Sequence, residues 1–187
     1  GTIEEAHAFI NPESTHTIDE KSAHIIDIFI DGSFEQSIQK YSFGMVVDLE
    51  EQVTLNKSFD DERFLVNRNV SGELLGAMYA FKWIIDNQQK DILYRINYDY
   101  EGIEKWATSE WKANKALTKC YAVISKEAMK KAHIKFNKVA AHAGVELNEV
   151  VDQLAKDALN QQSATIDLGF IDFEDVYKEI LPTVKED

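Results

Sequence analysis

Three segments of alternating hydrophobicity open the folded part of the chain, and they restrict its fold more than any other feature. In residues 24–31 (HIIDIFID) isoleucine recurs at every second position, which predicts a strand that ends on Asp31 before a Gly-Ser pair. Residues 40–48 and 52–59, separated by a short acidic turn, predict two more strands joined as a hairpin. The first third of the chain therefore predicts an antiparallel meander of three strands.

The hydrophobic period changes at Ser71, which fits an N-cap residue. Apolar side chains then recur at helical spacing from Leu74 to Ile85. The later patterns predict a strand at 92–99, a helix at 115–131, a strand at 133–142 and a last helix over about 150–159. Strands that alternate with helices pair in parallel. We expect an α/β fold with a mixed five-stranded sheet, three antiparallel strands followed by parallel strands, flanked by helices.

The length of the chain, 187 residues, suffices to bury about two thirds of the unfolded surface, so one domain is expected without disulfides. We expect this domain at residues 23–162, after an N-terminal arm or linker (1–22) and before an acidic C-terminal tail (163–187) with the pattern of one short helix. The sequence contains no signal-peptide pattern and no apolar run of membrane-span length. With a single cysteine, Cys120, the chain is predicted to be cytoplasmic, without a membrane partner.

The net charge of −13 argues against simple nucleic-acid binding, because phosphate contacts require lysine and arginine. Nine lysines nevertheless fall between residues 105 and 138, where only two acids occur. These lysines either contact phosphates or form the solvated face of helices. The charge distribution alone leaves both interpretations open.

Three acidic residues lie where predicted elements begin or end. Asp31 and Asp99 each close a strand, and Glu73 lies in the first turn of a helix, where the helix dipole favours its ionised form. Asp152 lies early in the last helix. In a chain with 33 acids, single acids reach such positions by chance. Gathered together, however, their carboxylates would repel one another and each pKa would rise, unless divalent cations neutralised them. Oxygen ligands of this type suit Mg²⁺ or Mn²⁺.

The order of four motifs supports a more specific hypothesis. IDIFIDGS, NVSGELLGAM, YRINYDYEGIEKW and VAAHAGVELNEVVDQLAK follow one another across about residues 24–160. In this order, and on these types of element, the motifs resemble type I ribonuclease H. The resemblance implies the ribonuclease H-like fold, and it implies that Asp31, Glu73, Asp99 and Asp152 bind two metal ions.

The resemblance also implies roles for residues around the carboxylates. His142, ten residues before the last aspartate, corresponds to a histidine that assists protonation or product release in the family, although a histidine near a strand end is more often a hydrogen-bonded structural residue. Asn69, four residues before the helix glutamate, falls where the family contacts its substrate. The segment DYEGIEKWATSEWKANK resembles a bacterial subgroup, in which Lys112 and Asn114 would meet phosphates, while its tryptophans fit either the core or the substrate surface.

The function implied by the resemblance is hydrolysis of the RNA strand of RNA/DNA hybrids with two Mg²⁺ or Mn²⁺ ions, by a protein expected to be a monomer. One alternative is a non-cleaving, hybrid-binding module of the same fold, against which the intact carboxylates argue. Another is a different nuclease of the superfamily, such as a junction resolvase, against which the histidine and the last helix argue. Ala140 and Ala141 replace a Lys-Gly pair common in the family, which bears on affinity more than on chemistry.

Overall fold

The computed structural model describes residues 23–140 and 146–184, which contain a mixed sheet of five strands. The strands are β1 (His24–Glu35), β2 (Lys40–Val47), β3 (Val53–Phe59), β4 (Ile92–Tyr98) and β5 (Ile134–Lys138). They lie in the order β3-β2-β1-β4-β5. The first three strands pair antiparallel, and β4 pairs in parallel with both β1 and β5. The predicted mixed five-stranded sheet is confirmed.

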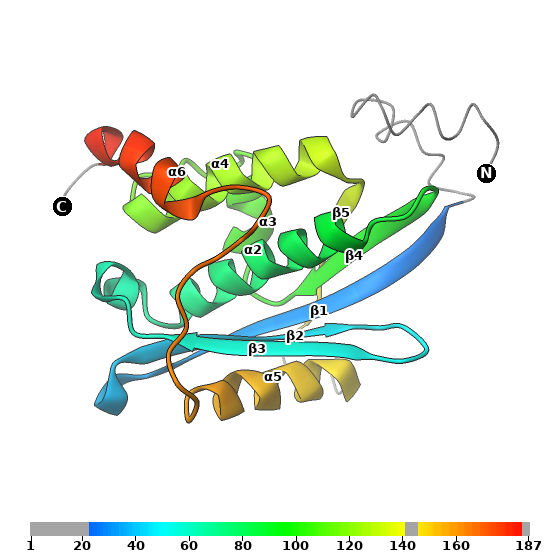
Figure 1. Cartoon of the computed structure of the whole chain (residues 1–187), viewed down its shortest axis with the longest axis horizontal. Helices are drawn as coiled ribbons and strands as arrows, with labels where there is room; N and C mark the ends of the chain where they lie inside the picture. The colour runs from blue at the N-terminus through cyan, green and yellow to red at the C-terminus, as the bar shows by residue number, and fades with distance from the viewer. Residues whose placement is uncertain (1–22, 141–145, 185–187) are drawn as a thin grey trace.

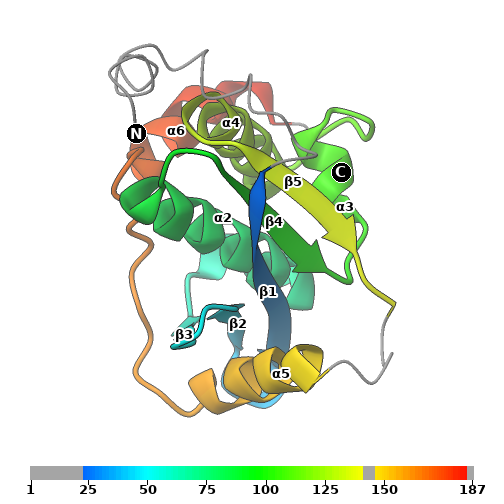
Figure 2. The ribbon, with the colours of Figure 1, turned by 90° about the vertical axis from the view of Figure 1, so that its right-hand side faces the viewer.

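Helices cover both faces of the sheet (Figures 1 and 2). One face carries α2 (Asn69–Asn87). Helices α3 (Gly102–Ala107) and α4 (Ala116–Lys131) contact α2, and α6 (Phe173–Ile180) packs on α4. The opposite face carries α5 (Glu146–Ala158), which contacts β1, β2 and β3. Short 3-10 segments η2 (Gln36–Ile38), η3 (Glu62–Asn67) and η4 (Leu181–Thr183) lie between or after these elements.

Strand β1 separates its apolar and acidic side chains by the alternation of a strand. Ile28 and Ile30 are buried, and Ile30 lies against α2 beside Gly76. Asp31 points to the opposite face, because its partner on β2, Gly44, lies directly under α5. The period-two pattern of the sequence therefore places the apolar core on the α2 side and Asp31 on the α5 side.

Helix α5 lies close to the sheet because residue 44 has no side chain. A Cβ atom on Gly44 would lie 2.3 Å from the carbonyl oxygen of Val151. The Ser42 hydroxyl and the Asn56 amide donate hydrogen bonds to carbonyl groups of α5 at 2.5 and 2.7 Å. These contacts fix α5, and with it Asp152, over β1 and β2.

The residues after α5 cross the β3 edge of the sheet and pack on the face that carries α2 (Figure 1). The Ala164 N–H donates a hydrogen bond to the carbonyl group of Ser58 on β3 at 2.7 Å. Leu168, Phe173 and Val176 are buried in the main core. The segment expected as an acidic tail is thus packed on the domain, and its expected short helix is α6. The domain boundary at residue 162 stays a prediction.

Several element boundaries differ from those expected. Strand β1 does not end at Asp31 but continues to Glu35, because its last residues pair with the start of β2. Helix α2 begins at Asn69, so Glu73 lies in its second turn rather than its first. Ser71 does not cap the helix; its hydroxyl donates to a carbonyl group of η3 at 2.6 Å. Helix α3 was not predicted.

Candidate active site

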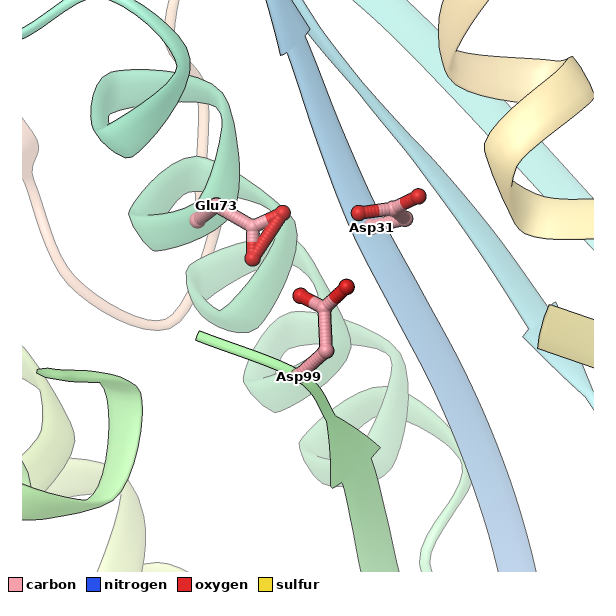
Figure 3. A group of neighbouring side chains, drawn as sticks. All are labelled: Asp31, Glu73 and Asp99. Carbon is pink, nitrogen blue, oxygen red and sulfur yellow. The ribbon is translucent and has the colours of Figure 1, made fainter. Parts of the chain in front are cut away.

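Three carboxylates from separate elements meet beside β1 (Figure 3). Asp31 lies on β1, Glu73 lies on α2, and Asp99 directly follows β4. One carboxylate oxygen from each residue lies within 4.8 Å of the others. Figure 3 shows the three side chains pointing toward one another. The tertiary structure therefore gathers three of the four acids that the sequence singled out.

Gly32 allows the first turns of α2 to lie directly against β1. A Cβ atom at this position would lie 2.5 Å from the backbone nitrogen of Glu73, which is closer than real Cβ contacts come. The Gly32 N–H also donates to Asp31 Oδ1 at 2.9 Å and to Glu73 Oε1 at 2.5 Å. One backbone donor thus holds two of the three carboxylates together.

The electrostatics of the site follow from burial and crowding. Glu73 is only 2% exposed, and burial, together with Asp31 and the charge of Asp99, raises its pKa well above the usual range. Burial raises the pKa of Asp31 to about 6, with further contributions from the charges of Asp99 and Asp152. The raised pKa values of Asp31 and Glu73 agree with the expectation that gathered carboxylates repel one another. For Glu73, burial outweighs the helix dipole, whose effect weakens beyond the first turn of the helix.

The three-carboxylate group fits a divalent cation. Glu73 Oε2 is buried and has no hydrogen-bond partner in the described part of the chain. Buried polar atoms are normally paired, so this oxygen has unused capacity as a ligand beside Asp31 and Asp99. Carboxylate oxygens are hard ligands that suit Mg²⁺ or Mn²⁺. A cation would also offset the repulsion among the carboxylates.

Asp152, the fourth predicted acid, lies near this group without joining it. The group found among the described residues consists of Asp31, Glu73 and Asp99. The Asp152 carboxylate forms an ion pair with Lys156, one turn further along α5, at 2.9 Å. Its charge nevertheless contributes to the raised pKa of Asp31. Because the paired side chains are 47% and 58% exposed, this ion pair opens at little cost.

Known proteins share both the sequence pattern and the fold. The sequence profile of the RNase H family matches residues 23–160. The chain belongs to the RNase H family. A ribonuclease H from Pseudoalteromonas translucida (strain TAC 125) is 25% identical over 154 residues, which cover 78% of this chain and 96% of that protein. Family membership confirms the predicted enzyme class, a ribonuclease H.

Two solved structures share the RNase H fold. RNase H1 from the halophilic archaeon Halobacterium salinarum NRC-1 has a TM-score of 0.60 and 17% identity, over 74% of this chain and 99% of that one. The N-terminal RNase H domain of rv2228c from Mycobacterium tuberculosis, as a fusion with maltose binding protein, has a TM-score of 0.60 and 15% identity, over 74% and 95%. Among the described helices, none has the length and apolar character that a membrane span requires.

The other predicted site residues of this RNase H family member have different placements. Asn69 is the exposed first residue of α2. Lys112 and Asn114 are exposed in the segment between α3 and α4. His142 lies outside the described residues. The roles implied for these four residues stay predictions.

The role of Gly32 was missed by reasoning from the sequence. The alternating pattern indicates this glycine only as a strand boundary, although a glycine directly after a strand aspartate is also a signal for close approach of another element. For the tryptophans, the sequence allows both a core role and a substrate role. Trp106 packs against the core, between the rings of Tyr100 and Trp111 at 6.0 and 5.3 Å.

Proposed function

We propose that this chain hydrolyses the RNA strand of RNA/DNA hybrids with two divalent cations, Mg²⁺ or Mn²⁺, held by Asp31, Glu73, Asp99 and Asp152. Membership of the RNase H family supports nuclease activity on hybrids. The observation that carries the metal-dependent mechanism is the three-carboxylate group with its buried, unpartnered Glu73 oxygen. The number of ions and the full ligand set are the finer part of the proposal.

Each of the four carboxylates has a different support. Asp31 lies on β1 and Asp99 directly follows β4, each two residues beyond Phe29 and Asn97, the last paired positions of these two strands, so the strand pairing brings them near each other. Glu73 is held by the Gly32 N–H and directs its second oxygen into the group. To hold a cation together with the group, Asp152 on α5 would give up its exposed ion pair with Lys156, which costs little. The bound cations supply activation of the attacking water and stabilisation of the leaving oxygen.

Residues around the carboxylates handle the substrate in this proposal. Asn69 lies about one helical turn before Glu73, so a nucleotide that it contacts lies beside the carboxylates. Lys112 and Asn114 contact phosphates, which fix the register of the hybrid without reading its sequence. His142 passes a proton to the leaving oxygen or loosens the product. Contacts with the 2′-hydroxyl across the wide minor groove give selectivity for RNA.

A cleavage assay with three substrates tests the proposed function. The protein is incubated with labelled RNA/DNA hybrid, double-stranded RNA or double-stranded DNA, in Mg²⁺ or in EDTA. We expect cleavage of the RNA strand of the hybrid, in Mg²⁺ only. Hybrid binding by the folded protein without cleavage would instead indicate a non-cleaving module, and cleavage confined to DNA would indicate another nuclease of the superfamily.

A matched pair of variants separates the site from general effects of charge. Asp99→Asn removes one ligand of the group and is expected to abolish cleavage while the protein stays folded. Asp86→Asn removes an exposed acid of α2 that pairs with Lys82, away from the group, and is expected to keep full activity. Equal activity of the two variants would contradict the assignment of Asp99.

A further inference from the structure

The C-terminal residues 161–184 lie beyond the family match, which ends at residue 160. Helix α6, which belongs to these residues, nevertheless packs on η3, the segment that precedes α2 and Glu73. The rings of Phe173 and Tyr177 on α6 meet the buried ring of Phe64 edge-on, at 5.8 and 6.0 Å between centroids. Phe64 belongs to η3, which lies within the residues that match the family. Segment η3 therefore packs on α6, which lies beyond them.

Arg63, also on η3, connects the same two segments through its side chain. The guanidinium group donates to both carboxylate oxygens of Glu174 on α6, at 2.7 and 2.9 Å, and to Asp61 at 2.7 Å. It also lies over the rings of Tyr177 and Phe64, at 4.4 and 4.9 Å from their centroids. A single exposed ion pair contributes little, but a bidentate guanidinium stacked on two rings has one preferred position.

Segment η3 leads directly into the first turn of α2. The Ser71 hydroxyl donates to the carbonyl oxygen of Phe64 at 2.6 Å, and the Arg68 N–H donates to that of Leu65 at 3.0 Å. Arg68 joins the two elements with φ 54° and ψ −130°, a conformation that is unfavourable for a residue with a side chain. Such a backbone persists only where its surroundings hold it. The next residue is Asn69.

We infer that Arg63, held by Glu174 of the C-terminal helix, is a positioning residue for the first turn of α2 and for Asn69. The contacts form an unbroken path, from Glu174 through Arg63 and its neighbour Phe64 to Ser71 in that turn. The consequence for substrate binding rests on the proposed function, in which Asn69 contacts the hybrid. Residues beyond the last helix of the family pattern thereby help to place a substrate contact.

Two single variants and their combination test this inference in the full chain. Arg63→Gln and Glu174→Gln each break the bidentate pair, one on each side, and the double variant removes both partners. We expect each single variant to raise the hydrogen-exchange rate of the amides in residues 65–73 by about threefold to tenfold. We expect KM for the hybrid to rise by a similar factor, which lies within the range found for residues along a coupling path. The turnover number changes less than KM, and the double variant is no worse than Arg63→Gln.

The control variant is Lys82→Gln, which breaks a Lys–Asp pair further along α2 and leaves η3 untouched. It is expected to match wild type in both measurements. A rise in KM for Arg63→Gln without one for Glu174→Gln would mean that Arg63 acts without being held by Glu174, which overturns the inference. Unchanged exchange in residues 65–73, or faster exchange along the whole of α2, would overturn it equally.

The exchange measurement does not depend on catalysis. If wild-type protein fails to cleave the hybrid, the proposed function is wrong, and the exchange of residues 65–73 in the two single variants still decides whether Arg63 and Glu174 position the first turn of α2.

Discussion

Replacement of Asp31 by Asn is expected to stabilise the metal-free protein at neutral pH. The pKa of Asp31 is about 6 in the native protein against a usual value of 3.8, and each pH unit corresponds to about 1.4 kcal/mol. Removal of the ionisable group therefore relieves at most about 3 kcal/mol, and about 1 to 3 kcal/mol after allowance for solvent screening. Asn can still accept the hydrogen bond from the Gly32 N–H, so the local backbone contact is kept.

The gain in stability should appear within a defined pH window. Native Asp31 keeps its proton up to about pH 6, whereas the unfolded chain releases it near 3.8, so the native protein binds more protons between these values. Wild-type stability attributable to Asp31 is thus fully present below about pH 4 and is lost as the pH rises through about 6. The advantage of Asp31→Asn should be small at pH 4 and reach its full size near pH 7.

Divalent cations should narrow the difference in stability between Asp31→Asn and wild type. Thermal melting in EDTA should place Asp31→Asn several degrees above wild type, because a chain of this size gains about 2 to 4 °C per kcal/mol. For a dissociation constant of about 1 mM, about 10 mM Mg²⁺ adds about 1.4 kcal/mol to wild type, and the variant should gain much less. The control Asp86→Asn should match wild type in both buffers. Melting of Asp31→Asn at or below wild type in EDTA at pH 7 would refute the reasoning.

Three further outcomes are expected. Gly44→Ala should lower the free energy of unfolding by about 1 to 3 kcal/mol, measured by urea denaturation, because the new Cβ atom would lie 2.3 Å from a carbonyl oxygen of α5; wild-type stability would contradict this close approach. His142→Ala should lower turnover at saturating hybrid by roughly one to three decades, with the Mg²⁺ dependence kept, and an unfolded variant would show that the histidine is structural. Neutralising Lys112 and Lys115 should reduce the salt dependence of hybrid affinity by about 0.7 to 0.9 in log–log slope for each phosphate that the protein no longer neutralises, whereas an unchanged slope would make these lysines a solvated face.

The order and type of most elements could be predicted from hydrophobic periodicity. Three alternating segments and the later helix–strand alternation are local patterns, and each requires one face to be buried. The mixed sheet follows from them because hairpin-connected strands pair antiparallel and strands joined by a helix pair in parallel. The motif order also placed Asp31, Glu73 and Asp99 in one site, as the structure does. The hydrophobic periods and the motifs can be read directly from the amino-acid sequence.

Element boundaries were harder to predict because they depend on pairing partners. Strand β1 passes Asp31 because β2 offers partners as far as Glu35, and no pattern within β1 signals this. Helix α2 starts at Asn69 because Ser71 donates to η3 instead of capping the helix. The short helix α3 lacks a full apolar stripe of its own, so its six residues carried no helical period.

The sequence by itself determined the sheet and most of its helices, because hydrophobic periodicity is a property of short stretches. The order of the motifs, through the resemblance to ribonuclease H, indicated the acidic residues. Only the tertiary structure decided how deeply those acids are buried. The repulsion among gathered carboxylates could be expected from the sequence, but the burial that contributes most to the raised pKa of Glu73 could not. Only the structure likewise decided that Arg63 meets Glu174, since the two residues approach each other only after the C-terminal segment crosses the sheet edge. Burial and contact between distant residues arise when the chain folds, and these determine the electrostatics of the site.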